Sequence, residues 1–396
     1  MTNELSAQRT VRNTGIKAIL LVLALVFILI PLAGKLTSRA ASPKLPSQAV
    51  SNWDIKTVDS TGQVGRFTSL ALDGSGYPHI SYHDVTNDDL KYARWDGAQW
   101  ITQTVDSAGQ VGAFSSLALD GSGNPHISYQ YATQGYVKYA KWDGSQWLFD
   151  QITNNFWPGI YTSLALDGSN NPHVSYYSIY DTVPPENRLK YRRWDGSQWL
   201  NIVTVDIGSY TGQYNSLALD GSGNPHISYY DALNDELRYA RWNGSQWLKE
   251  TVDSSGNVGG YTSIDLDGSN HPHISYYDYT NGDLKYARWD GSQWRIETVD
   301  SEGNTGGYTS LKLDGNGRPH ISYYDGRLRY ARWDGSQWHI ETVDSAGDVG
   351  LYTSLMLDED GNVHISYYDS TNGDLKYATG SVGGEYFIYI PLIVKE

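Results

Sequence analysis

Apolar and polar residues alternate in short runs along most of the chain, and from residue 53 onward these runs recur as one repeated unit. Each unit holds four runs in which β-branched and aromatic side chains alternate with polar ones, and turn pairs such as Asp-Gly separate the runs. Alternation with a period of two predicts strands, and the turn pairs predict hairpins. We therefore expect each unit to fold as four antiparallel strands.

Seven histidines, one at the start of each second strand, mark the repeat. The separations between them are 47, 47, 53, 47, 47 and 44 residues, and such periods are typical of stacked or radial repeats. Seven units of four strands predict an all-β fold, a seven-bladed β-propeller with four-stranded antiparallel blades. The histidines are His79, His126, His173, His226, His273, His320 and His364.

The two ends of the repeat region predict a closed ring. The chain begins with a fourth-strand sequence at residues 53–58, and its seventh unit ends after a third strand at residues 375–378. We therefore expect the N-terminal strand to complete the last blade, which closes the ring and removes exposed sheet edges.

The N-terminal region has a different composition, which predicts export. Basic residues precede the uncharged segment 18–34, and Ser38-Arg39-Ala40 offers the small residues of a signal-peptidase site. We expect residues 1–40 to be a signal peptide or, alternatively, an uncleaved membrane anchor, because the apolar run has an intermediate length. Residues 41–52 would be a linker, 53–379 the propeller and 380–396 a C-terminal tail. The protein would then be secreted or held at the cell surface.

Charge and composition narrow the classes of ligand. The formal net charge is −15, and residues 1–50 hold six basic residues and one acidic residue, so the net charge of the remainder is −20. Such a body repels phosphate, which argues against nucleic-acid binding. The chain has no cysteine, which excludes disulfides and thiolate metal sites. Asp-Gly-Ser-Gly-Asn at 120–124 and 220–224 resembles half of a calcium loop but lacks the closing Glu. We expect no cofactor, with calcium as the alternative.

The units resemble those of bacterial secreted β-propellers in the broad BNR/Asp-box (sialidase-like) and simple propeller-repeat group, and the resemblance covers residues 53–379. The segment Asp290-Gly291-Ser292-Gln293-Trp294 departs from the Asp-box spacing Ser/Thr-x-Asp-x-Gly-x-x-Trp. The resemblance implies the propeller fold and a range of roles, from glycosidases to lectins and binding proteins.

Symmetry argues against a catalytic or metal centre built from the repeated residues. One histidine per blade is spread too widely for a single metal site, and we expect each to be buried with the serine two residues later and a fourth-strand tryptophan. The arginines and glutamates also recur with the repeat, so no catalytic or metal-ligating residue is predicted. The sequence favours an exported, non-enzymatic propeller that binds a glycan or a protein. The alternatives are a sialidase-like glycoside hydrolase or lyase and a structural scaffold of the cell envelope.

Departures from the repeat gather in blades 2 to 4 and predict a ligand site. They supply aromatic rings beside polar side chains, the combination that saccharides need. The alternative is that these departures are sequence drift in a redundant repeat and form no ligand site. The predicted ligand-binding residues are Tyr131, Asn154, Asn155, Phe156, Trp157, Asp181, Glu186 and Tyr210.

A second hypothesis uses the repeat itself. Near-identical blades offer near-identical grooves, so weak sites could act together through multivalency. The repeated residues at the turn after the second strand, for example Tyr277, Asp278 and Lys285, motivate this hypothesis. A binding stoichiometry near one would contradict it.

Within the predicted patch, the Trp157→Ala variant should weaken ligand binding by roughly 1–3 kcal/mol, the scale of a buried aromatic anchor. Stability should change little. Calorimetric titration with a saccharide selected on a glycan array, together with a thermal melt, measures both quantities. If the variant unfolds readily while its folded fraction binds normally, Trp157 serves packing instead.

Overall fold

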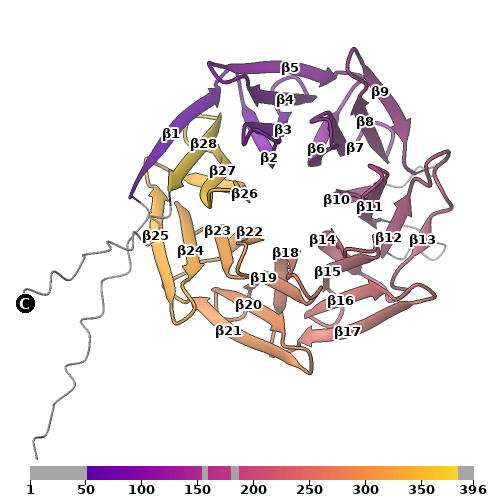
Figure 1. Ribbon diagram of the computed structural model, residues 1–396, viewed down its shortest axis with the longest axis vertical. Coiled ribbons are helices and arrows are strands. Elements are labelled where there is room, and N and C mark those ends of the chain that lie inside the picture. Colours follow the sequence, from indigo (N-terminus) through magenta and orange to yellow (C-terminus); the bar gives the residue numbers. More distant parts are fainter. Residues whose placement is uncertain (1–50, 154–158, 180–186, 382–396) are drawn as a thin grey trace, which may run out of the picture. The chain divides into compact units, whose positions relative to one another are not determined.

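The computed structural model describes residues 51–153, 159–179 and 187–381, which form 28 strands. The strands make seven four-stranded antiparallel sheets arranged as blades around one axis (Figure 1). The predicted fold class is therefore confirmed. Among the described residues, no helix is long and apolar enough to cross a membrane. The predicted signal or anchor segment, the linker up to residue 50 and the tail from residue 382 lie outside the described residues.

The strand bounds follow the repeat. Blade 1 contains β2 (Val64–Leu72), β3 (Pro78–Asp84), β4 (Asp89–Trp95) and β5 (Trp100–Asp106). Blade 2 contains β6 (Val111–Leu119), β7 (Pro125–Tyr131), β8 (Tyr136–Trp142) and β9 (Trp147–Gln151). Blade 3 contains β10 (Gly159–Leu166), β11 (Pro172–Ser178), β12 (Arg188–Arg193) and β13 (Val203–Thr204). Blade 4 contains β14 (Thr211–Leu219), β15 (Pro225–Asp231), β16 (Glu236–Trp242) and β17 (Trp247–Asp253). Blade 5 contains β18 (Val258–Leu266), β19 (Pro272–Asp278), β20 (Asp283–Trp289) and β21 (Trp294–Asp300). Blade 6 contains β22 (Gly307–Leu313), β23 (Pro319–Tyr324), β24 (Leu328–Trp333) and β25 (Trp338–Asp344). Blade 7 contains β26 (Val349–Leu357), β27 (Asn362–Asp369), β28 (Asp374–Ser381) and β1 (Ser51–Asp59).

The first strand of the chain closes the ring, as predicted. In blade 7, β1 pairs antiparallel with β28, with Ile55 opposite Ala378 and Thr57 opposite Lys376. Figure 1 shows this closure as the indigo β1 lying beside the yellow β28. The last blade is thus built from both ends of the propeller sequence, and ring closure protects the edge that β28 would otherwise expose.

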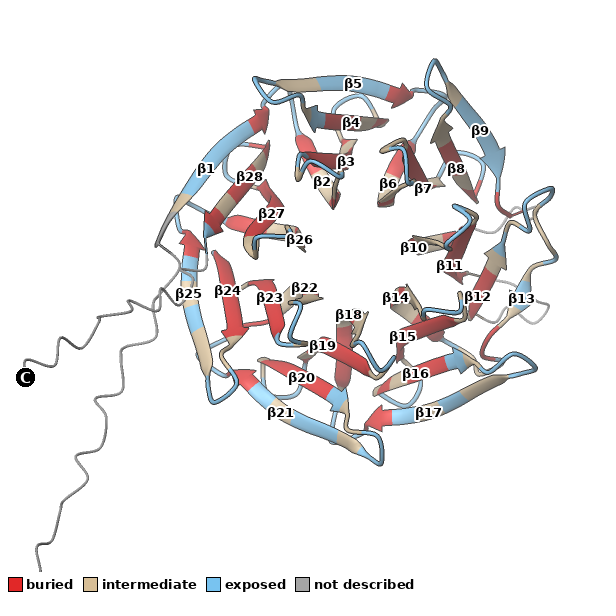
Figure 2. Ribbon diagram, in the orientation of Figure 1, coloured by how far each residue is buried: buried red, intermediate tan, exposed pale blue. Residues whose placement is uncertain are grey.

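The core lies between neighbouring blades. One cluster combines Leu237 and Tyr239 of blade 4 with Ile264, Ile274 and Tyr276 of blade 5. Figure 2 shows burial falling from the inner and middle strands to outermost strands such as β5, β9 and β21. Burying a side chain of this size stabilises a fold by about 1.5–3 kcal/mol, so every blade depends on its neighbours for most of its apolar packing.

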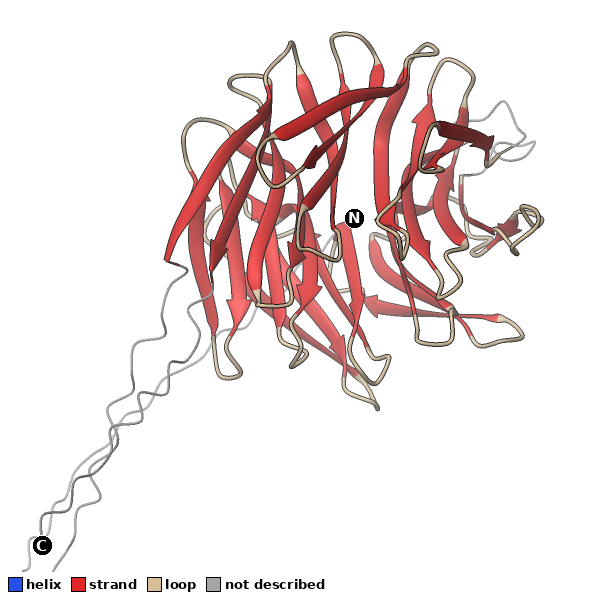
Figure 3. Ribbon diagram, turned by 45° about the horizontal axis from the view of Figure 1, so that its top comes forward, coloured by secondary structure: helices blue, strands red, loops and turns tan. Residues whose placement is uncertain are grey.

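The turns divide between two faces of the ring, because the loops gather at the two ends of the strands (Figure 3). We call the face with the turns between the second and third strands, and with the blade-to-blade loops, the upper face. The lower face carries the other two turns of each blade, such as Asp220–Asn224 and Asn243–Gln246 in blade 4.

The repeated histidine is buried in a hydrogen-bonded cluster, as expected, but its partner differs from the predicted serine and tryptophan. His226 Nδ1 pairs with the hydroxyl of Tyr239 on the third strand. The serine two residues later, Ser228, instead pairs with Thr262 of the next blade at 2.7 Å. The strand register explains the difference. Tyr239 lies opposite Ser228, so it is the diagonal neighbour of His226 on the same face of the sheet, and its hydroxyl comes next to the imidazole.

Each innermost strand contains a bulge that turns an aromatic residue into the left-handed backbone region. In blade 1 the register slips between Arg66 and Ser69, and Phe67 has φ of 54°. The bulge directs the next residue toward the neighbouring blade, where Thr68 Oγ1 donates a hydrogen bond to the carbonyl of Tyr352 at 3.0 Å. The backbone strain is therefore offset by a bond between blades. The seven residues, with φ between 52° and 55°, are Phe67, Phe114, Tyr161, Tyr214, Tyr261, Tyr308 and Tyr352.

Together these side chains form a closed belt, which we call the axial aromatic ring. Consecutive ring centroids lie 4.4–4.8 Å apart all the way around, including the contact between Tyr352 and Phe67. The interplanar angles of the seven pairs range from 39° to 67°, so neighbouring rings are tilted against each other rather than stacked face to face. The alternation of apolar and polar residues does not predict this ring.

Candidate functional site

Most of the predicted upper-face patch lies outside the described residues. Asn154, Asn155, Phe156, Trp157, Asp181 and Glu186 belong to that part of the chain, and their role stays a prediction. Tyr131 packs edge-on against Tyr136 at 5.1 Å, and the Lys138 amine lies 5.1 Å from its ring centre. Tyr210 is 47% exposed. Among the described residues no contact joins Tyr131 to Tyr210.

Two of the three upper-face residues that motivate the multivalent hypothesis are buried, which argues against repeated grooves there. The third, Tyr277, is half-buried and donates its hydroxyl to Asn304. Lys285 and Asp278 are both buried. Lys285 Nζ donates to Asp253 Oδ2 at 2.6 Å, and Tyr276 donates its hydroxyl to the same oxygen at 2.6 Å. The Asp278 carboxylate accepts the backbone N–H groups of the turn that follows it. Lys285 is engaged with Asp253 at the end of blade 4, and Asp278 is engaged with its own turn. Both side chains are therefore poor candidates for contacting a ligand.

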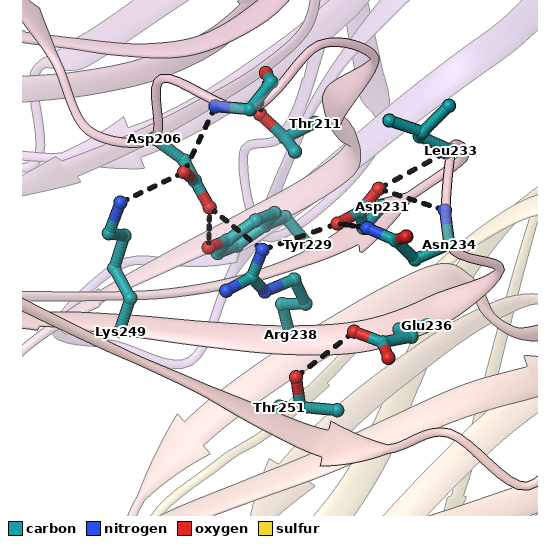
Figure 4. Close-up of polar contacts among 11 residues, drawn as sticks. Asp206, Thr211, Tyr229, Asp231, Leu233, Asn234, Glu236, Arg238, Lys249 and Thr251 are labelled. Carbon is teal, nitrogen blue, oxygen red and sulfur yellow. Dashed lines mark hydrogen bonds and ion pairs between the residues drawn. The ribbon is translucent and has the colours of Figure 1, made fainter.

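Blade 4 shows how dense this upper-face network is (Figure 4). Asp206 accepts hydrogen bonds from Tyr229 at 2.7 Å and Lys249 at 2.9 Å. Arg238 bridges Asp206 and Asp231 at 3.4 and 3.2 Å. Burial by itself raises the pKa of Asp206, but these hydrogen bonds and the arginine outweigh it and hold the pKa below its usual value. The network therefore locks the fourth strand of one blade to the next blade.

The lower face carries cavities in the grooves between blades. The groove between blades 4 and 5 holds a cavity of about 410 Å³, and the groove between blades 5 and 6 holds one of about 470 Å³. A third, of about 300 Å³, lies between blades 1 and 2. Cavities of this size match those that bind small ligands. The lower-face grooves are therefore the candidate site.

The groove between blades 4 and 5 brings a cation, a carboxylate and indole rings together. Arg241 and Glu250 come from blade 4, and Trp289 and Trp294 come from blade 5. The guanidinium of Arg241 is exposed and has no ion-pair partner among the described residues. Glu250 Oε2 accepts the indole N–H of Trp294 at 3.3 Å, which fixes the carboxylate against the ring. The two indoles lie edge-on with centroids 5.8 Å apart.

A neutral histidine completes the wall of this groove. Burial lowers the pKa of His226 to about 4, so the imidazole is uncharged near pH 7. Its Nδ1 is paired with the Tyr239 hydroxyl, and its Nε2 lies 3.8 Å from Asp220 Oδ2. The ring therefore contributes an uncharged polar edge to the wall of the groove.

The other grooves repeat this arrangement with substitutions. In every blade the fourth-strand residue opposite the repeated third-strand tyrosine occupies the position of Glu250. Two groove positions combine an arginine and a glutamate of one blade with two tryptophans of the next blade, equivalent to Trp289 and Trp294. They are the groove between blades 4 and 5 and the groove between blades 5 and 6. In blade order, the residues at the arginine position are Arg94, Lys141, Arg193, Arg241, Arg288, Arg332 and Thr379. Those at the glutamate position are Gln103, Asp150, Val203, Glu250, Glu297, Glu341 and Lys56.

In the sequence these arginines and glutamates recur with the repeat, and their recurrence alone does not mark a site. The signal that could have found the site is their position in the alternation, because Arg241 and Glu250 both lie on the lower half of neighbouring strands. The partner tryptophan comes from the next unit, 44 residues after Glu250. A comparison within single units therefore could not reveal the groove.

The lower-face turns use their aspartates as caps. Asp120 Oδ1 accepts the backbone N–H groups of Ser122 and Asn124 at 2.9 and 2.8 Å, and Oδ2 accepts the Asn124 amide at 3.0 Å. In the described part of the chain, no group of three or more histidine, aspartate or glutamate residues is arranged to hold a metal ion. The segments that resemble half of a calcium loop form hairpin turns between the first and second strands of their blades, and calcium binding by them stays the alternative stated from the sequence.

Comparisons with known proteins identify the fold. No protein-family model matches the chain, and no curated protein matches it. Among solved structures, an ulvan lyase of polysaccharide lyase family PL25 has a TM-score of 0.57 at 15% identity, covering 82% of this chain and 96% of that one. The lectin SapL1 in complex with α-methyl fucoside has a TM-score of 0.50 at 14% identity, covering 73% and 99%. A mutant of AofleA from Arthrobotrys oligospora has a TM-score of 0.51 at 13% identity, covering 74% and 90%.

Proposed function

We propose that this protein is a binding propeller for neutral glycans and that it holds them in its lower-face grooves. The observation that carries the proposal is the groove between blades 4 and 5, where Arg241, Glu250 and Trp294 surround a cavity of about 410 Å³. Structural neighbours that bind or act on glycans, a fucoside-bound lectin and an ulvan lyase, support a glycan as the ligand, and of these the fucoside is neutral.

The chemistry of the groove suits a sugar. A sugar hydroxyl both donates and accepts, so a guanidinium can donate to its oxygen while a carboxylate accepts its proton. The C–H faces of a sugar ring pack on aromatic rings. The groove supplies all three groups. The guanidinium of Arg241 and the carboxylate of Glu250 come from blade 4, and the indole of Trp289 comes from the facing blade 5. The net charge of −15 disfavours anionic polysaccharides, because the whole surface repels them.

Repetition supports binding over catalysis. The same arginine, glutamate and tryptophan positions occur in two adjacent grooves, whereas a single active site needs residues that break the symmetry. One oxygen of the Glu250 carboxylate also accepts the indole N–H of Trp294, which fixes the side chain against the groove wall. We infer further that the protein acts outside the cell, on the basis of the basic and apolar N-terminal sequence.

The test is a binding screen with matched variants. Neutral monosaccharides and their oligomers, presented on an array and then titrated by calorimetry with calcium or with chelator, should include at least one ligand. The double variant Glu250→Gln/Glu297→Gln should weaken its binding about tenfold, because an amide accepts a weaker hydrogen bond than a carboxylate.

The matched control is Glu236→Gln/Glu302→Gln, which removes the same charge from the opposite face. In blade 4, Glu236 accepts a hydrogen bond from Thr251 at 3.0 Å and takes no part in a groove (Figure 4). Equal affinities for the two double variants, or tight binding of anionic glycans only, would contradict the proposal.

A further inference from the structure

The two cavities that flank blade 5 share part of their lining. His271 and Trp289 border both the cavity between blades 4 and 5 and the cavity between blades 5 and 6. These residues therefore form a ridge with an open groove on each side. A ligand held in one groove meets the same two side chains as a ligand held in the other.

These two grooves are also the ones with the full set of side chains. Arg288 and Glu297 repeat Arg241 and Glu250 in the next blade, with the same register against the third-strand tyrosine. Arg288 is exposed and, like Arg241, has no ion-pair partner among the described residues. The lining of the cavity between blades 5 and 6 includes Arg288 but not Glu297. Each of the two cavities thus has one of these arginines in its lining.

The ridge itself differs from the other blades. At the position of His271, four blades carry an asparagine whose amide donates to the turn aspartate at 2.8–3.1 Å. In blade 5 the imidazole replaces this cap, with Nδ1 3.4 Å from Asp267 Oδ2 and its side chain 35% exposed. The substitution places a wider, partly exposed polar ring at the point where the two cavities meet.

We propose that the two grooves flanking blade 5 form one continuous site, which binds an extended neutral oligosaccharide across Trp289 and His271. The inference rests on the proposed function and adds to it the length of the ligand. One chain that fills both grooves loses its translational freedom once, so its second contact forms at a high effective concentration.

The experiment is a calorimetric length series. Linear neutral oligomers of glucose, mannose, galactose and N-acetylglucosamine, from one to six units, are titrated into the full chain. For the series that binds, the hexamer should bind at least about tenfold more tightly than the monomer, as expected for linked contacts. The number of hexamers bound per chain should be one fewer than the number of monomers.

Matched variants show which residues are responsible for the higher affinity of the longer oligomers. Trp289→Ala should abolish the preference for longer oligomers, whereas Trp142→Ala, the same position in blade 2, should retain it. Both tryptophans pack edge-on against a partner in their own blade, at 5.8 and 5.6 Å, so the two variants have comparable effects on packing. His271→Asn installs the residue of the sister blades, preserves the fold and should reduce the preference.

The outcomes separate the two proposals. If monomers and hexamers bind equally well and in equal number, or if Trp289→Ala and Trp142→Ala behave alike, the continuous site is wrong while glycan binding stands. If no neutral saccharide of any length binds the wild-type chain, the proposed function itself is wrong.

Discussion

Lowering the pH from 7 to 5 should destabilise the propeller by several kilocalories per mole. Five of the seven repeated histidines have a pKa lowered to about 4, and burial is the main cause in each. In the unfolded chain the same side chains titrate near pH 6.5. The five residues are His126, His173, His226, His273 and His320.

The free energy of unfolding falls with the pH because unfolding takes up protons. Between pH 6.5 and 4 the unfolded chain binds protons that the folded chain excludes, so the free energy of unfolding falls as the pH falls. Each histidine contributes a loss of about 1 to 2 kcal/mol between pH 7 and 5, and five contribute roughly 5 to 10 kcal/mol. That sum is comparable to the whole stability of many domains, about 5–15 kcal/mol.

Guanidinium denaturation followed by tryptophan fluorescence at pH 7, 6 and 5 measures the effect. Calorimetry in buffers of different ionisation enthalpy counts the protons taken up on unfolding at pH 5, which should be close to five from these histidines. The His126→Asn variant should take up one proton fewer. Denaturation midpoints that do not change between pH 7 and 5 would show that the histidines are protonated in the native ring.

Replacing Asp253 by alanine should cost about 3–5 kcal/mol of stability, because the change leaves a buried ammonium group without its partner. Asp253 is 5% exposed and accepts hydrogen bonds from Lys285, Tyr276 and Ser255. Burial raises the pKa of this carboxyl, but those hydrogen bonds outweigh it and lower the pKa to about 2. The carboxylate is therefore charged near pH 7.

Two controls separate this mechanism from the loss of any aspartate. Asp54→Ala removes a carboxylate that is 58% exposed and pairs with Lys56 at 3.1 Å, so it should cost under about 1 kcal/mol. Adding Lys285→Met to Asp253→Ala should restore part of the stability, since it removes the unpaired charge. Equal denaturation midpoints for Asp253→Ala and Asp54→Ala, or no recovery in the double variant, would contradict the buried ion pair as the cause.

The fold was predictable because its information is local and repeated. The alternation around His273, the Asp-Gly turns and the unfinished seventh unit predict strands, blades and ring closure without any long-range contact. The axial aromatic ring was not predictable in this way. Alternation places Phe67 on a strand but says nothing of a positive φ, which the bulge after Gly65 and the hydroxyl of Thr68 stabilise.

The candidate site was harder to predict, because its parts come from different blades. Trp294 reaches Glu250 only when two units are packed at the angle that a seven-membered ring imposes. The upper-face residues of the repeat, such as Asp278 and Lys285, looked more available in the sequence than the lower-face ones. Their burial follows from the same packing, which no single unit reveals.

The axial aromatic ring also limits how this protein could have grown by duplication of its gene segment. Seven side chains spaced 4.4–4.8 Å apart close a circle with a radius of about 5 Å. Eight would need a radius of about 6 Å at the same spacing, with a smaller turn between neighbouring rings. An eighth unit would thus change the packing of every member of the axial aromatic ring, including Phe67. The number of units is therefore tied to the contacts at the axis, whereas the outer strands and the lower-face grooves make no such contact.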